Sequence, residues 1–179
     1  FMLMPGRLDH TDAAEQIPAF TLRSIDGIQK GVVVWITDQG KFGLLQDDQV
    51  IPPVATLLNG GYTVLSADLS GQGEFLSSDD RLVSQRMWHQ RDATAGWHRF
   101  SGYTYGYNHS LFVQRTHDIL SLIKYAVTLS GEQSVHLVGL DKAAGPLVLA
   151  ARSQAGDLVN TTIVDLDGFR FNQLTRHDD

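Results

Sequence analysis

The segment from residue 135 to residue 151 restricts the fold more than any other part of the chain. It opens with the apolar run Val135-His136-Leu137-Val138, which is short enough to be a buried strand and which stops at Gly139. An alanine-rich stretch then starts at Ala143, with its apolar residues at helical spacing. A short apolar run that ends at glycine indicates a strand, and the change to a period of three or four residues indicates a helix. The segment therefore predicts a strand, a sharp turn and a helix in direct succession.

Short apolar runs and helical periods alternate along most of the chain. The expected strands cover residues 19–25, 31–36, 62–67 and 161–166, and the expected helices cover residues 46–59 and 108–130. Strands that alternate with helices favour a mostly parallel sheet with helices on both faces. We therefore expect one α/β domain over residues 19–179, built as a three-layer α/β/α structure. Residues 1–18 are polar and show no pattern, so we expect them to form an N-terminal arm.

The charge balance argues against nucleic-acid and membrane partners. The 179 residues carry a net charge of −6 without a block of Lys or Arg, whereas such partners require clustered positive charge. No apolar run approaches the roughly 20 residues of a membrane span. The absence of Cys excludes disulfides and thiolate chemistry, and it suits a reducing or an oxidising compartment. We therefore expect a soluble protein that acts on a small or neutral molecule, without a cofactor.

The turn after residue 138 has the spacing of a nucleophile elbow. In such a turn small residues stand two positions before and two positions after the reactive side chain, because the tight bend leaves no room beside it. Gly139 and Ala143 form this small pair, so Asp141 holds the position of the nucleophile. A carboxylate there can form a covalent ester with a substrate. It can equally cap the following helix, whose dipole favours negative charge at its N-terminus, and both interpretations stay open.

Six segments follow one another in an order that is typical of one superfamily. They are the strand and loop at 32–40, the strand and loop at 62–73 with its Asp68-x-x-Gly71-x-Gly73 motif, and residues 103–108, 111–118, 139–145 and 167–171. In this order they resemble α/β-hydrolases, and more narrowly the bacterial proteins similar to acetyl xylan esterases and dienelactone hydrolases. The resemblance covers about residues 19–172. It implies an α/β-hydrolase-like sheet that lacks the last strands.

The resemblance implies where an oxyanion hole would lie. In these hydrolases one donor is the backbone N–H of the residue after the nucleophile, which is Lys142 here. The other donors come from the loop after an earlier strand, which corresponds to Asp38, Gln39, Gly40 and Lys41. Donors placed in this way stabilise the negative charge that develops during acyl transfer.

The resemblance also implies a catalytic acid and a histidine. Asp165 or Asp167 would be the acid, because they lie at the end of the next expected strand. His177 is the only histidine after Asp141. The reaction implied is hydrolysis of a carboxylic ester, such as an acetyl or carbohydrate ester. Two departures from the family, an aspartate at the nucleophile position and the absence of the usual histidine segment, imply that catalysis is impaired.

Three further patterns have structural explanations. The long aromatic connection over residues 75–108 is expected to line a site or to cap the fold. The histidines at positions 89, 98 and 109 match no tight ligand spacing, so we expect no metal site. Gly71-Gln72-Gly73 follows an expected strand but lacks the third glycine of a dinucleotide-binding motif.

A non-catalytic role is the alternative function. In a sheet that stops at residues 161–166, this strand is an edge with unpaired backbone groups and apolar residues on both faces. Such an edge favours pairing with another chain, so we expect a homo-oligomer or a partner that covers it. The chain would then be a binding or subunit-interaction protein derived from the hydrolase fold.

Overall fold

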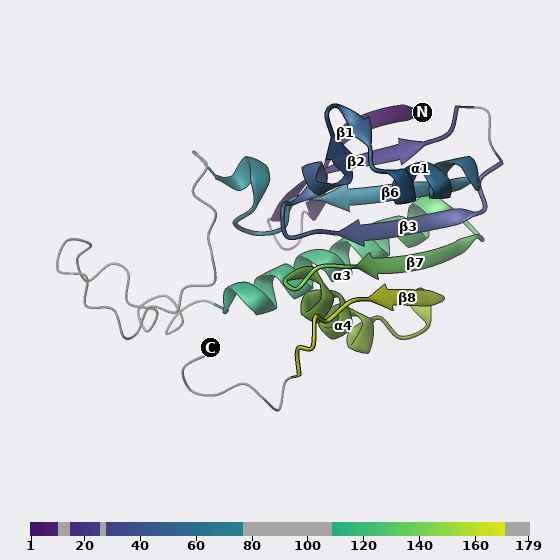
Figure 1. Cartoon of the computed structure of the whole chain (residues 1–179). Helices are drawn as coiled ribbons and strands as arrows, with labels where there is room; N and C mark the ends of the chain where they lie inside the picture. The colour runs from purple at the N-terminus through teal and green to yellow at the C-terminus, as the bar shows by residue number, and fades with distance from the viewer. Residues whose placement is uncertain (11–14, 26–27, 77–108, 171–179) are drawn as a thin grey trace.

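The computed structural model describes residues 1–10, 15–25, 28–76 and 109–170. In this part of the chain one sheet has six strands in the order β1-β2-β6-β3-β7-β8 (Figure 1). The strands are β1 (Met2–His10), β2 (Glu15–Arg23), β3 (Gly31–Ile36), β6 (Tyr62–Ala67), β7 (Ser134–Gly139) and β8 (Thr161–Val164). Strand β3 runs parallel to β6 and β7, and β7 runs parallel to β8. Strand β2 is antiparallel to both β1 and β6.

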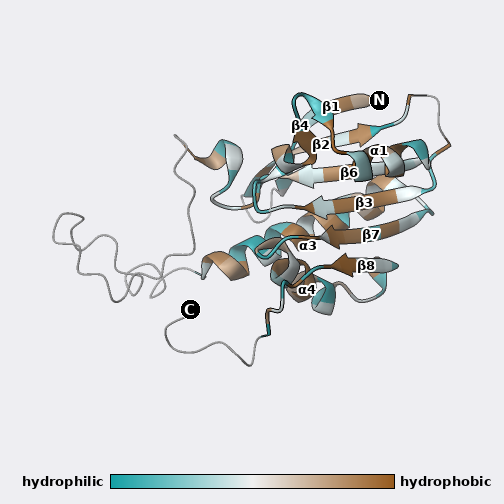
Figure 2. Ribbon diagram, viewed as in Figure 1, coloured by the Kyte–Doolittle hydropathy of each residue, from teal (hydrophilic) through white to brown (hydrophobic). Residues whose placement is uncertain are grey.

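Helices cover both faces of the sheet, which confirms the expected three-layer α/β/α fold (Figure 1). Helix α1 (Pro52–Asn59) packs on one face with Val54 and Leu58, next to Val33 and Val64 of the sheet. Helices α3 (Leu111–Ser130) and α4 (Ala144–Ala155) pack together on the other face. The two faces carry separate hydrophobic cores, and Figure 2 shows hydrophobic residues gathered along the central strands.

The first helix is shorter than the helical period over residues 46–59 predicts. A small hairpin of β4 (Leu45–Gln46) and β5 (Gln49–Val50) precedes it, and the helix begins only at Pro52. Asp47 and Asp48 form the turn of this hairpin with φ values of 51° and 59°, a left-handed conformation that aspartate tolerates better than most residues. Proline suits the first turn of a helix, because its missing N–H would have no partner there.

Residues 1–18, which we expect to be an arm, supply β1 and the beginning of β2. Residues Met2 to His10 pair with residues Arg23 to Glu15 in an unbroken antiparallel register. Most side chains of β1 are exposed, so this strand carries no apolar pattern in the sequence. Backbone hydrogen bonds rather than buried side chains hold it to the sheet, and patterning arguments do not detect such a strand.

Helix α3 begins at Leu111, where the Ser110 side chain accepts a hydrogen bond from the N–H of Val113 at 3.3 Å. A serine in this position satisfies one of the free N–H groups of the first turn. Most of the aromatic connection expected over residues 75–108 lies outside the described residues. None of the helices in the described ranges is long and apolar enough to cross a membrane.

Candidate functional site

Three loops meet at one edge of the sheet. Strands β3, β6 and β7 are parallel neighbours, so the residues that follow them emerge at the same edge. These are residues 37–41 after β3, residues 68–74 after β6, and residues 140–143 after β7. Ligands of open α/β sheets bind at this carboxyl edge. The loops therefore form the candidate functional site, which we call the carboxyl-edge site.

The turn after β7 is as tight as its sequence predicts. Strand β7 ends at Gly139 and α4 begins at Ala144. A methyl group added at Gly139 would lie 2.7 Å from a side-chain carbon of Val148, and one added at Gly145 would lie 2.1 Å from the carbonyl oxygen of Asp165. Both glycines therefore allow close packing of helix α4, against β7 and against the segment after β8.

Asp141 lies in this turn and its carboxylate accepts three backbone hydrogen bonds. Oδ1 accepts from the N–H groups of Ala143 at 3.1 Å and Ala144 at 2.6 Å. Oδ2 accepts from the N–H of Asp38 at 2.9 Å. The first two bonds cap helix α4, and the third joins the turn to the loop after β3. The Asp141 side chain therefore has the geometry of a helix cap, and it stands at the position that the nucleophile of an elbow would hold.

The backbone of Asp141 does not have a positive φ. Among the described residues other than glycine, a positive φ occurs at Asp47, Asp48 and Asp167, and Asp141 is not one of them. A nucleophile elbow is a strained turn that exposes its reactive side chain. Asp141 lacks a positive φ, and its half-buried side chain is hydrogen-bonded to the loop after β3.

The loop after β3 contributes one N–H to Asp141, and its other N–H groups are bonded elsewhere. The N–H of Gln39 donates to the Thr37 hydroxyl at 3.2 Å, and that of Gly40 donates to the carbonyl of Thr37 at 3.4 Å. The N–H of Lys41 donates to Asp68 Oδ1 at 2.9 Å. Of the expected oxyanion-hole residues, the structure therefore brings only Asp38 to the elbow residue. The Lys142 side chain is exposed, and the role of the Lys142 backbone N–H as the other donor stays a prediction.

Lys41 is instead the centre of an ionic cluster that no sequence pattern indicates, in which Lys41 and Asp68 are buried and the Glu74 side chain is 59% exposed. Its ammonium group contacts Asp68 Oδ2 and lies 2.6 Å from Glu74 Oε1. Asp68 is 0% exposed, and its Oδ2 also accepts the Glu74 N–H at 3.0 Å. The cluster ties the loop after β3 to the loop after β6. Only the position of Asp68, directly after an apolar strand, hinted at this role.

Asp165 and Asp167, the candidate acids, hydrogen-bond to Gly139 and to each other. The N–H of Asp165 donates to the carbonyl of Gly139 at 2.9 Å, and its Oδ1 accepts from the N–H of Asp167 at 2.9 Å. Asp167 is exposed and has a φ of 45°. His177 lies outside the described residues. The assignment of Asp165 or Asp167 as the acid and of His177 as the base stays a prediction.

An open hollow of about 580 Å³, lined by both polar and apolar side chains, adjoins the site on the side of α3. Its lining includes Glu15, Ser70, His117 and Asp118. Asp118 accepts a hydrogen bond from the Ser70 N–H at 2.7 Å, and Arg115 Nε donates to the Ser70 carbonyl at 2.9 Å. Burial raises the pKa of the Asp118 carboxyl above its usual value, and the Ser70 N–H opposes this shift. Burial also lowers the pKa of Arg115.

The raised pKa of Asp118 predicts a stability change with pH. The folded protein holds the Asp118 proton more tightly than the unfolded chain does, and this difference stabilises the fold. The stabilisation is complete below pH 3.8, the usual pKa of the group, and is lost as the pH rises through the pKa of the folded state. The Asp118→Asn variant stays neutral throughout. We expect its free energy of unfolding to rise relative to wild type between a pH below 3.8 and neutral pH, measured by urea denaturation. The exposed Asp157→Asn variant is the control, and a pH-independent difference for Asp118→Asn would contradict the assignment.

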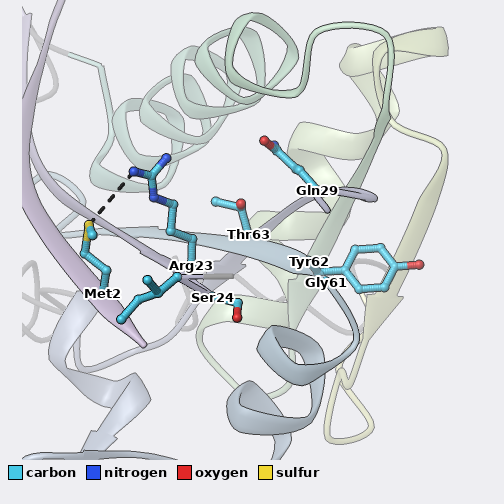
Figure 3. A pocket seen from close by; sticks show the side chains of 8 residues that line it. Met2, Arg23, Ser24, Gln29, Gly61, Tyr62 and Thr63 are labelled. Carbon is cyan, nitrogen blue, oxygen red and sulfur yellow. Dashed lines mark hydrogen bonds between the residues drawn. The ribbon is translucent and has the colours of Figure 1, made fainter. Parts of the chain in front are cut away.

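A second hollow of about 200 Å³ opens at the opposite edge of the sheet (Figure 3). Figure 3 shows Arg23, Gln29 and Thr63 around it. A guanidinium nitrogen of Arg23 lies 3.9 Å from the sulfur of Met2. It lies where the parallel strands begin, away from the loops that hold Asp141. Within the described residues no group of three or more His, Asp or Glu side chains is arranged to hold a metal ion.

No protein-family model matches this chain, and no curated protein matches its sequence. Solved structures, however, resemble its fold. A thermostable carboxyl esterase from Bacillus coagulans matches with a TM-score of 0.57 at 10% identity, over 90% of this chain and 43% of that protein. Acetyl xylan esterase 1 from Thermoanaerobacterium matches with a TM-score of 0.52 at 15% identity, over 83% and 43% of the two chains.

A peptidase shares the same architecture. Oligopeptidase B from Leishmania major matches with a TM-score of 0.58 at 14% identity, over 90% of this chain and 19% of that protein. The chain thus spans less than half the length of each of these three proteins. At identities this low, the TM-scores show a shared α/β fold and leave the reaction to be argued from the site.

Proposed function

We propose that this chain is a carboxylic-ester-hydrolase-like protein whose carboxyl-edge site receives small esters, acetyl and carbohydrate esters among them, and whose turnover of them is impaired. The esterases of similar fold support the ester class. The hydrogen bond from the Asp38 N–H to Asp141 Oδ2 is the observation that supports impaired turnover.

This hydrogen bond opposes ester hydrolysis because it is already made in the resting protein. An oxyanion hole accelerates acyl transfer only if its donors bind the developing anion more strongly than anything they hold beforehand. Here a carboxylate, itself an anion, occupies the Asp38 donor. A substrate carbonyl would have to displace it.

The chemistry of a carboxylate nucleophile adds a second obstacle. Attack of Asp141 on an acyl carbon would form an anhydride and expel an alkoxide. The alkoxide is a far stronger base than the carboxylate, so this step runs uphill. Serine at the same position would instead exchange one ester for another. Both arguments predict poor turnover with aspartate at position 141.

A turnover assay tests the proposal. With p-nitrophenyl acetate, we expect wild type to be no faster than Asp141→Ala. We expect Asp141→Ser to exceed both by about tenfold to a hundredfold, because it frees the Asp38 N–H and supplies a hydroxyl. The exposed Asp157→Ser variant controls for an added surface serine. A different result would contradict the proposed impairment. In it, wild type hydrolyses the ester, Asp141→Ala abolishes the hydrolysis and Asp141→Ser keeps it, which would show that the elbow is catalytically active.

A non-catalytic binding or subunit role is the second proposal. In the described residues β8 pairs with β7 on one side only, and Ile163 on it is 54% exposed. An apolar strand at a sheet edge favours pairing with a further strand, from a second copy or another partner. Absence of turnover in every variant of the ester assay, together with a dimer in sedimentation, would favour this role over the first.

A further inference from the structure

Gln72 is a buried glutamine whose side chain crosses from the loop after β6 to the loop after β3. It is 6% exposed. Its Oε1 accepts a hydrogen bond from the Leu69 N–H at 3.1 Å, and its Nε2 donates to the carbonyl of Asp38 at 3.1 Å and to that of Thr37 at 3.4 Å. The Leu69 N–H can only donate, so it fixes the oxygen of the amide on its own side. The two hydrogens of Nε2 therefore face the two carbonyls.

These two carbonyls belong to the peptide groups on either side of Asp38. The Thr37 carbonyl and the Asp38 N–H are the two ends of one planar peptide unit. Gln72 holds the carbonyl end, and the N–H end donates to Asp141 Oδ2 at 2.9 Å. The next peptide unit is held in the same manner, since Gln72 binds the Asp38 carbonyl and Thr37 Oγ1 accepts the Gln39 N–H.

The residues around Gln72 make this reach possible. Gly71 and Gly73 have φ values of 71° and 46°, which glycine adopts at little cost. A methyl group at Gly73 would lie 2.3 Å from the Asp68 carboxylate. The Gly71-Gln72-Gly73 segment, which the dinucleotide-binding interpretation leaves unexplained, thus presents an amide to the neighbouring loop.

We infer that Gln72 is a positioning residue that orients the Asp38 N–H toward side chain 141 and whatever anion forms there. The inference rests on the proposed function, in which the Asp38 N–H is the oxyanion donor. Gln72 acts through the peptide group and does not itself contact the reacting atoms.

Amide hydrogen exchange, followed by NMR, tests the inference directly. We expect Gln72→Met to speed exchange of the Asp38 N–H about tenfold, as the loss of about 1.4 kcal/mol of local ordering predicts. Exchange in β3 and β7 should stay unchanged. Gln72→Glu keeps an oxygen that accepts from the Leu69 N–H but removes the donor to the carbonyls of Thr37 and Asp38, so we expect it to speed exchange of the Asp38 N–H as well. Gln29→Met is the matched control, because it removes a glutamine bond to the Leu129 carbonyl at the other edge of the sheet.

Wild-type protein gives a second measurement that needs no variant. The side-chain amide protons of Gln72 should exchange more slowly than those of the exposed Gln133. Equal exchange rates would overturn the inference, as would an Asp38 N–H that is unaffected in both Gln72 variants.

Kinetics separate this inference from the proposed function. In the Asp141→Ser background, we expect Gln72→Met to lower kcat for p-nitrophenyl acetate about tenfold and to leave KM unchanged, the pattern of an interaction made in the transition state. A change in KM alone would overturn the positioning role. Absence of any turnover in Asp141→Ser would count against the proposed function, while the exchange measurements still decide the role of Gln72.

Discussion

Replacement of Lys41 by methionine is expected to lower the free energy of unfolding by about 3–5 kcal/mol, the range for removing one partner of a buried ion pair. Lys41 is 3% exposed and Asp68 is 0% exposed, so water cannot solvate the charge that remains. Without the ammonium group, the Asp68 carboxylate stays buried with no cation beside it, whereas the Glu74 side chain is 59% exposed and in contact with water. Methionine has nearly the length and volume of the lysine stem, so the loss is one of charge rather than of packing.

Urea denaturation measures this effect against two controls. Lys124→Met makes the same substitution at an exposed position of α3 and is expected to change stability by less than about 0.5 kcal/mol. The double variant Lys41→Met with Asp68→Asn removes both buried charges and should recover part of the loss. A Lys41→Met variant as stable as Lys124→Met would show that the cluster does not stabilise the fold.

Replacement of Gly145 by alanine is expected to destabilise the protein by about 1–3 kcal/mol, the usual cost of overpacking. Inside a helix this change ordinarily stabilises by up to about 1 kcal/mol. Here the added methyl group would lie 2.1 Å from the carbonyl oxygen of Asp165 and 3.0 Å from its carbonyl carbon. Backbone atoms cannot rotate away as a side chain can, so the start of α4 has to shift.

Gly6→Ala is the matched control, because a methyl group there meets no atom within 4 Å. Urea denaturation should place it within about 0.5 kcal/mol of wild type. A stabilised Gly145→Ala variant would mean that α4 and the segment after β8 are less closely packed than described.

The sequence predicts the covered sheet because its central strands are buried on both faces. Strand β3 is buried along its whole length, and such a strand appears as the unbroken apolar run Val32-Val33-Val34-Trp35-Ile36. The turn at Asp141 is equally visible, since it places small residues at fixed offsets. Strand β1 escapes prediction because its side chains face water and only its backbone is paired. The α/β class is therefore confirmed, whereas the length of the sheet at that edge is not predictable from patterning.

The candidate site is less predictable because its contacts link distant parts of the chain. Asp38 and Asp141 are individually notable in the sequence, but no local pattern indicates that the amide of one binds the carboxylate of the other. Lys41 was expected to belong to an oxyanion loop through its position, whereas its charge is used in a buried cluster with Asp68. In the sequence, Gln72 is distinguished only by its place between Gly71 and Gly73. The catalytic roles of Asp165, Asp167 and His177 stay predictions.

The joined loops have a consequence for the order in which the protein folds. The hydrogen bond between Asp38 and Asp141 joins residues 103 positions apart in the sequence, and the hydrogen bond between Ser70 and Asp118 joins residues 48 positions apart. The pairing of β3 with β7 spans the same 103 residues, from Gly31 to Ser134, so the Asp38–Asp141 bond costs little further chain entropy once these two strands are paired. A chain in which β3 and β7 are not yet paired would therefore lack this arrangement of amides and carboxylates. Any activity of the site would therefore belong to the completed native state alone.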